Sequence, residues 1–76
     1  MVFEKVQKIV ADQLNVELDK VQMETNFLED LNADSLDQVE LIMAVEDAFD
    51  IEVPDEVAQD IKTVGDIVRV LEENGK

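Results

Sequence analysis

The run Ser-Leu-Asp-Gln-Val-Glu-Leu-Ile-Met-Ala-Val-Glu-Asp-Ala-Phe, residues 35–49, has the clearest helical pattern in the chain and decides its fold. At about 100° per residue, one set of apolar side chains falls on a single face, which we expect to meet the core. These residues are Leu41, Ile42, Val45, Ala48 and Phe49. Asp34 or Ser35 can cap the start of this helix, and Asp37 suits the positive end of its dipole.

A second, narrower apolar line runs along the far side of the same predicted helix. It consists of Leu36, Val39 and Met43, and three carboxylates frame it: Glu40, Glu46 and Asp47. A surface helix needs only one apolar face, so this line requires a partner. Two interpretations stay open at this point. Either the preceding loop covers the line, or it is exposed and docks basic, partly apolar proteins, for which an adaptable Met is well suited.

The rest of the chain is also predicted to be helical. Apolar spacing predicts a first helix over Val2–Leu14, followed by a long connection of residues 16–34 whose apolar side chains, Val21, Met23, Phe27, Leu28 and Leu31, we expect to cover the core. Pro54 opens a short helix of about residues 55–61, and Thr63 with Asp66 forms a capping box for a last helix that ends at Asn74 and Gly75. The prediction is an all-α domain over residues 1–76, a small bundle of three main helices and one short helix with a long first loop.

Charge is distributed very unevenly along the sequence. Twenty acidic residues against six basic ones give a net charge of −14, and no Lys or Arg lies between Lys20 and Lys62. Such a surface repels nucleic acids and anionic membranes, and it attracts proteins with basic patches. We therefore expect protein partners, no nucleic acid and no membrane insertion.

Several function classes are excluded by what the sequence lacks. Without Cys there is no disulfide framework or thiol nucleophile, and without His the commonest general base is missing. No apolar run is long enough to span a membrane, and the N-terminus is amphipathic rather than a secretory signal. We expect a cytoplasmic, monomeric protein that is not an enzyme.

Residues 27–37, Phe-Leu-Glu-Asp-Leu-Asn-Ala-Asp-Ser-Leu-Asp, resemble the attachment motif of acyl carrier proteins. The Val39-Glu40-Leu41 run and residues 49–56 are similar to the same family, and the resemblance covers essentially the whole chain. It is closest in kind to the free-standing carriers of bacterial fatty acid synthesis. One departure is Asn32, where the family usually has Gly, but Asn tolerates left-handed backbone angles.

The resemblance implies that Ser35, flanked by Asp34 and Leu36, carries a 4′-phosphopantetheine arm whose thiol holds acyl groups as thioesters. The start of a helix favours such a phosphate. It also implies a phosphopantetheinyl transferase, fatty acid synthesis enzymes and acyltransferases as partners, meeting the second helix at Leu36, Asp37, Val39, Glu40, Met43, Glu46 and Asp47. In the family the acyl chain slides between helices, and the corresponding lining here is Phe27, Leu41, Val45, Val53, Ala58, Ile61 and Ile67. Each of these residues is equally well explained as ordinary core.

Other interpretations stay open, both within the carrier proteins and in other functional classes. Carriers of polyketide, D-alanyl or peptidyl groups fit the same motif. Asp30, Asn32 and Asp34 match the opening of a calcium-binding loop, but Ser35 and Leu41 occupy positions that require Gly and a bidentate Glu. A serine hydrolase lacks a base. No specific metal site is predicted, although weak divalent binding is plausible at Asp34 with Asp37, and at Glu46 with Asp50.

Overall fold

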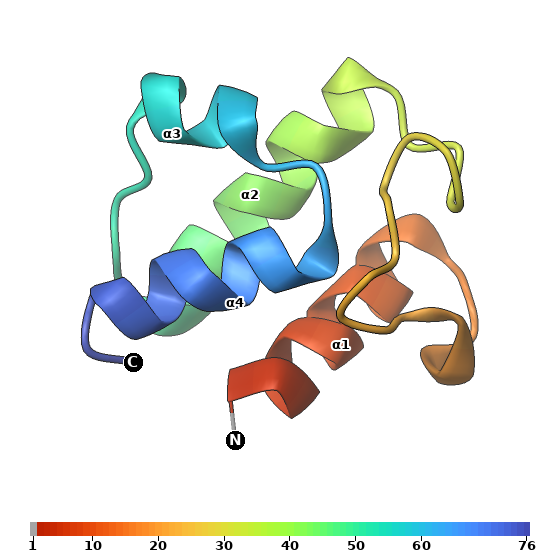
Figure 1. The fold of residues 1–76 in the computed structure, drawn as a ribbon, viewed down its shortest axis with the longest axis horizontal. Coiled ribbons are helices and arrows are strands. Elements are labelled where there is room, and N and C mark those ends of the chain that lie inside the picture. The colour runs from red at the N-terminus through yellow and green to blue at the C-terminus, as the bar shows by residue number, and fades with distance from the viewer. Residues whose placement is uncertain (1) are drawn as a thin grey trace.

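The computed structural model describes residues 2–76, and within that range it contains four α-helices and one 3₁₀ turn. They are α1 (Val2–Leu14), η1 (Leu18–Lys20), α2 (Ser35–Phe49), α3 (Asp55–Asp60) and α4 (Val64–Glu73). Figure 1 shows α1 in the lower part of the fold, α2 passing behind α4, and α3 at the end away from both termini. The all-α prediction is confirmed, with three long helices and one short one.

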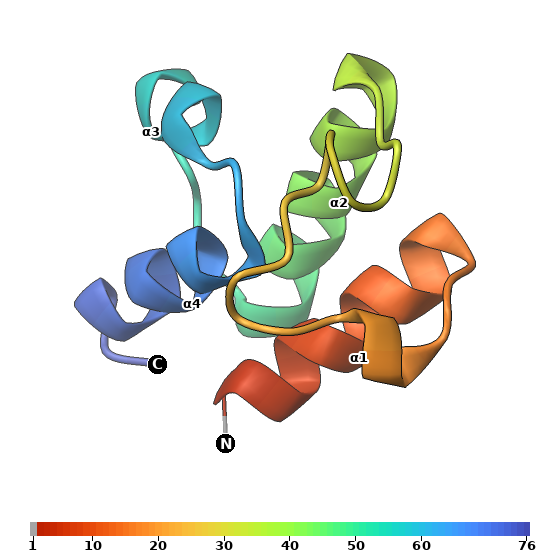
Figure 2. The same cartoon turned by 45° about the vertical axis from the view of Figure 1, so that its right-hand side comes forward.

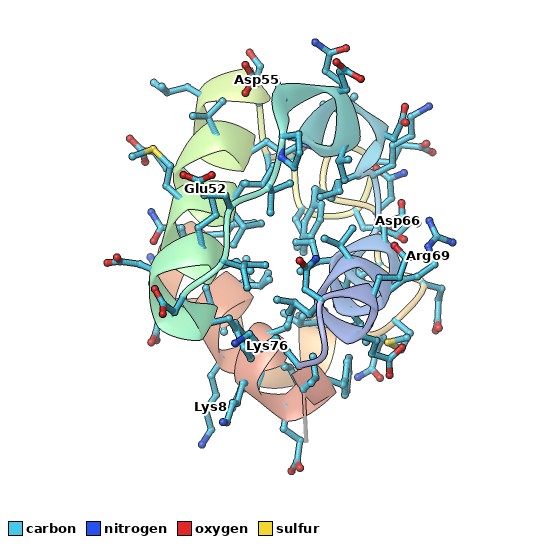
Figure 3. The ribbon with its side chains drawn as sticks, turned by 90° about the vertical axis from the view of Figure 1, so that its left-hand side faces the viewer. Lys8, Glu52, Asp55, Asp66, Arg69 and Lys76 are labelled. Carbon is cyan, nitrogen blue, oxygen red and sulfur yellow. The ribbon has the colours of Figure 1, made fainter. Side chains whose placement is uncertain are left out.

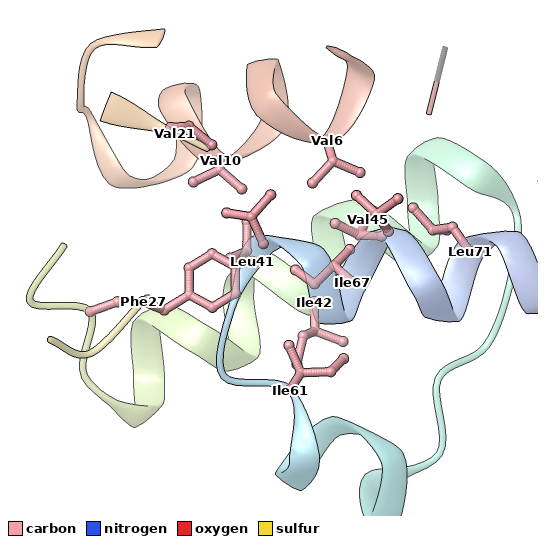
Figure 4. Packing of buried hydrophobic residues seen from close by; sticks show 13 residues of the cluster. Val6, Val10, Val21, Phe27, Leu41, Ile42, Val45, Ile61, Ile67 and Leu71 are labelled. Atoms are coloured by element: carbon pink, nitrogen blue, oxygen red, sulfur yellow. The ribbon is translucent and has the colours of Figure 1, made fainter. Parts of the chain in front are cut away.

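The core lies where α1 packs against both α2 and α4. Apolar side chains from these three helices, from the long first connection and from the short link between α3 and α4 are buried together. They are Val6, Val10, Val21, Phe27, Ala33, Leu41, Ile42, Val45, Ile61, Val64, Ile67, Val68 and Leu71. In Figure 4, Leu41 lies toward α1 near Val10 with the Phe27 ring beside it, whereas Ile42 and Ile61 lie farther from α1. Of the predicted core face of α2, Leu41, Ile42 and Val45 are buried and Phe49 is half-buried. Ala48 is exposed, because it sits at the edge of the buried arc, so that assignment was wrong.

Local sequence signals set the helix ends. Asn15 and Asp50 have φ angles of 55°, and these left-handed residues end α1 and α2. At the start of α4 the Thr63 side chain accepts the backbone N–H of Asp66, and Asp66 returns the bond, as the capping-box prediction requires. The short helix α3 ends one residue earlier than predicted, since Ile61 is extended and buried in the core.

The long first connection is pinned to the link between α3 and α4. Phe27 N–H donates to the carbonyl of Lys62 at 3.0 Å, and Val64 N–H donates to that of Thr25 at 3.0 Å. Val21 and Phe27 are buried, so this connection covers the core as expected, and Leu31 is half-buried. Met23 and Leu28 are exposed, which contradicts the prediction for these two side chains. Figure 2 shows the connection crossing between α1 and α2.

No helix among residues 2–76 is long and apolar enough to cross a membrane.

Candidate functional site

The N-terminus of α2 is closed by two carboxylates. Asp34 is the N-cap, and its Oδ1 accepts the backbone N–H of Asp37 at 2.9 Å. The Asp37 carboxylate accepts the N–H of Asp34 at 3.3 Å, which completes a capping box. This arrangement fixes the first turn and makes Ser35 the first helical residue. The choice that the sequence left between Asp34 and Ser35 as cap is thereby resolved in favour of Asp34.

Ser35 is exposed, and its hydroxyl has no hydrogen-bond partner among residues 2–76. It is the only serine of the chain, and the other aliphatic hydroxyls are those of Thr25 and Thr63. Thr25 is buried and donates its hydroxyl to the carbonyl of Lys20, and Thr63 caps α4. Ser35 is therefore the one hydroxyl in the described chain that is both accessible and uncommitted.

The surroundings of Ser35 form an open groove between α2 and α3. Its lining comes from the first two turns of α2 and from α3: Ser35, Gln38, Val39, Ile42, Asp55, Ala58 and Gln59. Figure 3 shows Asp55 at the top of the molecule beside the start of α2, while Lys8 and Lys76 lie at the opposite end. A group attached to Ser35 thus emerges at the acidic end of the fold, away from those two lysines.

The groove leaves the Ser35 hydroxyl accessible, and the one carboxylate in its lining is that of Asp55 on α3. The nearest acids in sequence, Asp34 and Asp37, are engaged in the capping box, and the chain contains no His or Cys. Backbone N–H groups at the helix start and the helix dipole favour an attached phosphate, although the two capping carboxylates oppose it. The geometry suits acceptance of a group delivered by another protein.

The second apolar line of α2, which we name the docking stripe (Leu36, Val39 and Met43), is exposed. Exposed fractions are 66% for Leu36, 54% for Val39 and 60% for Met43. The expectation that these side chains face solvent is confirmed, and the alternative that the loop covers them is wrong. Glu40 and Asp47 beside the stripe are exposed as well.

The remaining carboxylates predicted around the stripe have other structural roles. Glu46 is half-buried, and its Oε2 accepts the backbone N–H of Val53 at 2.6 Å. Asp37 is half-buried in the capping box. No group of three or more His, Cys, Asp or Glu within residues 2–76 is placed to hold a metal ion. In the loop that resembles a calcium site, the Asp30 carboxylate accepts the N–H of Asn26 at 2.7 Å.

A small apolar cavity of about 10 Å³ lies beneath the link between α2 and α3. Its lining includes four of the predicted chain-binding residues, Val45, Val53, Ile61 and Ile67, together with Ile42, Ile51, Val70 and Leu71. Ala58 lines the Ser35 groove instead. Phe27 and Leu41 line neither, although both side chains are fully buried in the core.

Sequence reasoning missed Gln38, whose side-chain amide donates to the carbonyl oxygen of Ile61. A polar residue between two apolar stripes is usually solvated, so the sequence carries no signal for this bond.

The surroundings of the Asp66 carboxyl change its pKa. The backbone N–H of Lys62 is the main cause that lowers the pKa of Asp66, and Thr63 and Arg69 add to it. Asp66 and Arg69 lie together on α4, as Figure 3 shows, and neither residue lines the Ser35 groove.

Comparison with known proteins identifies what this arrangement resembles. The family described as "Phosphopantetheine attachment site" matches residues 4–71. A curated protein named "Acyl carrier protein" from Clostridium acetobutylicum is 56% identical over 71 residues, which cover 93% of this chain and 92% of that protein. Both matches include Ser35 and all four helices in substantial part.

Proposed function

This chain belongs to the acyl carrier protein family, and from that premise we propose that Ser35 bears the 4′-phosphopantetheine arm on which it carries fatty acyl groups. The observation that supports Ser35 most directly is its hydroxyl. It is exposed at the first turn of α2, unbonded, and the only such hydroxyl in residues 2–76. The arm supplies the thiol that the chain lacks, so an acyl group is held as a thioester.

The chain's part in its own modification is to present an oxygen. The Ser35 oxygen forms a bond to the phosphorus of coenzyme A that bears the pantetheine. The pyrophosphate bond to the nucleotide breaks, so a phosphodiester forms on Ser35 and the nucleotide leaves with its own phosphates. We propose that the proton of the serine passes to a base on the transferase, because the nearest carboxylates in sequence, Asp34 and Asp37, are committed to the helix cap. We therefore propose that the carrier itself is not an enzyme. Because coenzyme A is an intracellular cofactor, we propose the cytoplasm as its compartment.

Partners would meet the docking stripe. Leu36, Val39 and Met43 offer exposed apolar area, and Glu40 and Asp47 offer charge for Lys or Arg on the opposite surface. We propose a phosphopantetheinyl transferase, fatty acid synthesis enzymes and acyltransferases with basic patches as the proteins that bind there. Rim charges of this kind mainly raise the association rate. A tethered thioester then reaches the partner's active site at high effective concentration.

Intact-mass measurement tests the attachment. Incubation with coenzyme A, Mg²⁺ and a phosphopantetheinyl transferase should add one phosphopantetheinyl group to the wild-type chain. Ser35→Ala should keep its helical circular dichroism and gain no mass. Addition of the group to Ser35→Ala, or no addition to the wild type with a transferase that modifies the Clostridium relative, would contradict the proposal. Loading the modified chain with malonyl, acyl, D-alanyl or aminoacyl groups by their respective enzymes distinguishes the carrier types.

A further inference from the structure

The segment of residues 53–61, which we call the lid, connects α2 to α4 and packs only partly against the core. It contains α3, and no residue of α3 is buried. Of its two ends, Val53 is half-buried and Ile61 is buried. Inside the lid the backbone bonds are local, with Ala58 N–H donating to the carbonyl of Pro54 and Ile61 N–H to that of Ala58. Core packing of the lid is thus concentrated at Ile61, with partial packing at Val53 and Ala58, and polar contacts with α2 add to it.

Two side chains of α2 bond to the two ends of the lid. Glu46 accepts the backbone N–H of Val53 at 2.6 Å. Gln38 donates its side-chain amide to the carbonyl of Ile61. The lid runs antiparallel to α2 in this pairing, because the later α2 residue holds the earlier end of the lid. Eight residues of helix span about 12 Å, so the two bonds are well separated.

Ile42 lies between these two polar residues on the same side of α2, since positions 38, 42 and 46 repeat every four residues. Ile42 lines both the Ser35 groove and the apolar cavity, so it forms the boundary between them. Val53 and Ile61, the two bonded ends of the lid, also line the cavity. The hydrogen bonds therefore close an apolar space that adjoins the attachment residue.

The closed cavity is too small for a chain of several methylenes. A volume of about 10 Å³ holds about one water-sized probe. Well-packed interiors have no spare room, so a chain that enters must displace part of the wall. The helices α1, α2 and α4 share the main core, whereas α3 has no buried residue. The lid is the section of wall that moves at least cost in buried apolar area.

We propose that Gln38 and Glu46 are positioning residues that hold the lid closed, and that their two bonds break when an attached acyl chain enters the cavity. This inference rests on the proposed function, since the chain reaches the cavity from Ser35. The two bonds act on one segment, so loss of either one loosens both ends of the lid. They also set how readily the carrier shields a long acyl group from water.

Amide hydrogen exchange in the unmodified protein tests the hold on the lid. The informative amide is the one remote from the altered bond: Ile61 for Glu46→Met, and Val53 for Gln38→Met. Glu46→Gln is the matched control for Glu46→Met, because both remove one charge and only Gln keeps an acceptor oxygen. Gln13→Met, at an exposed position of α1, is the control for Gln38→Met.

Each Met variant should speed exchange at the remote end of the lid by about five- to tenfold, the factor expected for one net hydrogen bond. Exchange at Val10 and Leu71 in the core should stay unchanged, and Glu46→Gln and Gln13→Met should resemble the wild type. Unchanged exchange at the remote ends would overturn the proposal. An equal increase at Val10 and Leu71 would also overturn it, because the side chains would then stabilise the whole fold rather than the lid.

The second readout uses the modified protein loaded with octanoyl or acetyl groups. If chain entrance breaks the two bonds, the Met variants no longer have to break them, so the sequestered state becomes more populated. Hydroxylamine should then cleave the octanoyl thioester several-fold more slowly in Gln38→Met and Glu46→Met than in the wild type. The acetyl thioester, too short to enter, should be cleaved at one rate in all three proteins. An unchanged or faster octanoyl rate refutes the gating step.

These measurements separate the lid from the attachment. Failure of Ser35 to accept phosphopantetheine would refute the proposed function, and the exchange experiment on the unmodified chain would still report on the two bonds. Attachment without any exchange effect would refute the lid alone.

Discussion

Replacing the same residue at an exposed and at a buried position of α2 separates docking from folding. Val39 is 54% exposed and Val45 is 2% exposed, so Val39→Ala and Val45→Ala form a matched pair on one helix. Removing two buried carbons at about 0.8 kcal/mol each, plus a cavity term, should make Val45→Ala cost about 2 kcal/mol. Val39→Ala should cost almost nothing, because little burial is lost and Ala has the higher helix propensity.

Thermal unfolding followed by circular dichroism measures this difference. In a domain of this size, 1 kcal/mol shifts Tm by about 4–8 °C, so Val45→Ala should lower Tm by roughly 8–16 °C. Val39→Ala and Met43→Ala should stay within about 3 °C of the wild type, given that exposed substitutions stay near ±0.5 kcal/mol. The kcat/KM of the phosphopantetheinyl transferase should fall about fivefold or more for Met43→Ala, the effect of losing a contact worth ~1 kcal/mol.

The charges beside the stripe should act through the rate of association. Glu40→Lys should slow binding to a basic partner, more strongly at low salt than at high salt, because screening weakens exposed charge pairs. Glu46→Lys should in addition speed amide exchange at Val53, since the N–H of Val53 loses its acceptor. If Met43→Ala lowers Tm as Val45→Ala does, or leaves the transferase kinetics unchanged, the docking hypothesis is wrong.

Three further outcomes follow from charge and backbone geometry. Mg²⁺, Ca²⁺ or monovalent salt should raise Tm, because thirteen acids from Glu24 to Asp60 lie without a base between them; a Tm indifferent to salt would contradict this account. Asn32 has a φ of 54°, so Asn32→Ala should cost about 1–2 kcal/mol while Asn32→Gly should leave Tm nearly unchanged. Asp66→Asn should lower Tm at pH 7 by weakening the Asp66 half of the capping box, at a cost of ~1 kcal/mol. Because the pKa of Asp66 is lowered by folding, its contribution is present above the ordinary carboxyl range and disappears as pH falls through the lowered pKa, so the two melting curves should converge in acid.

The helices and the two faces of α2 were predictable because their signals are local. The two-stripe pattern of residues 35–49 requires only helical periodicity, and both the buried Leu41 and the exposed Met43 follow from it. The capping box of Thr63 with Asp66 needs only a spacing of three residues. Asn15 ends α1 because it adopts left-handed angles, which are local as well.

The errors arose where a side chain's surroundings come from distant parts of the chain. Met23 and Leu28 are exposed because the backbone bonds of the first loop to residues 62–65 fix its path, and no sequence rule supplies that pairing. Phe27 and Leu41, predicted to share one lining with Ile61 and Ile67, do not border the apolar cavity that those two residues line. Periodicity shows that a residue faces inward, but it does not show which neighbour it meets.

The polar positions at the border of a helix's apolar face are a separate case, and α2 shows why. Gln38, Ile42 and Glu46 follow one another at intervals of four, so a buried residue lies between two polar side chains that point the same way. The polar groups of Gln38 and Glu46 find protein partners only where a second backbone segment runs alongside α2. That segment must offer one carbonyl and one N–H that are not already paired. Residues 61 and 53 offer them because a six-residue helix leaves its flanking groups unpaired by its own turns. We therefore expect side-chain hydrogen bonds to hold a segment that has two features. It contains a short helix without buried residues, and it lies beside a helix with polar, apolar and polar side chains four residues apart. Such a segment opens more readily than one held by buried apolar side chains.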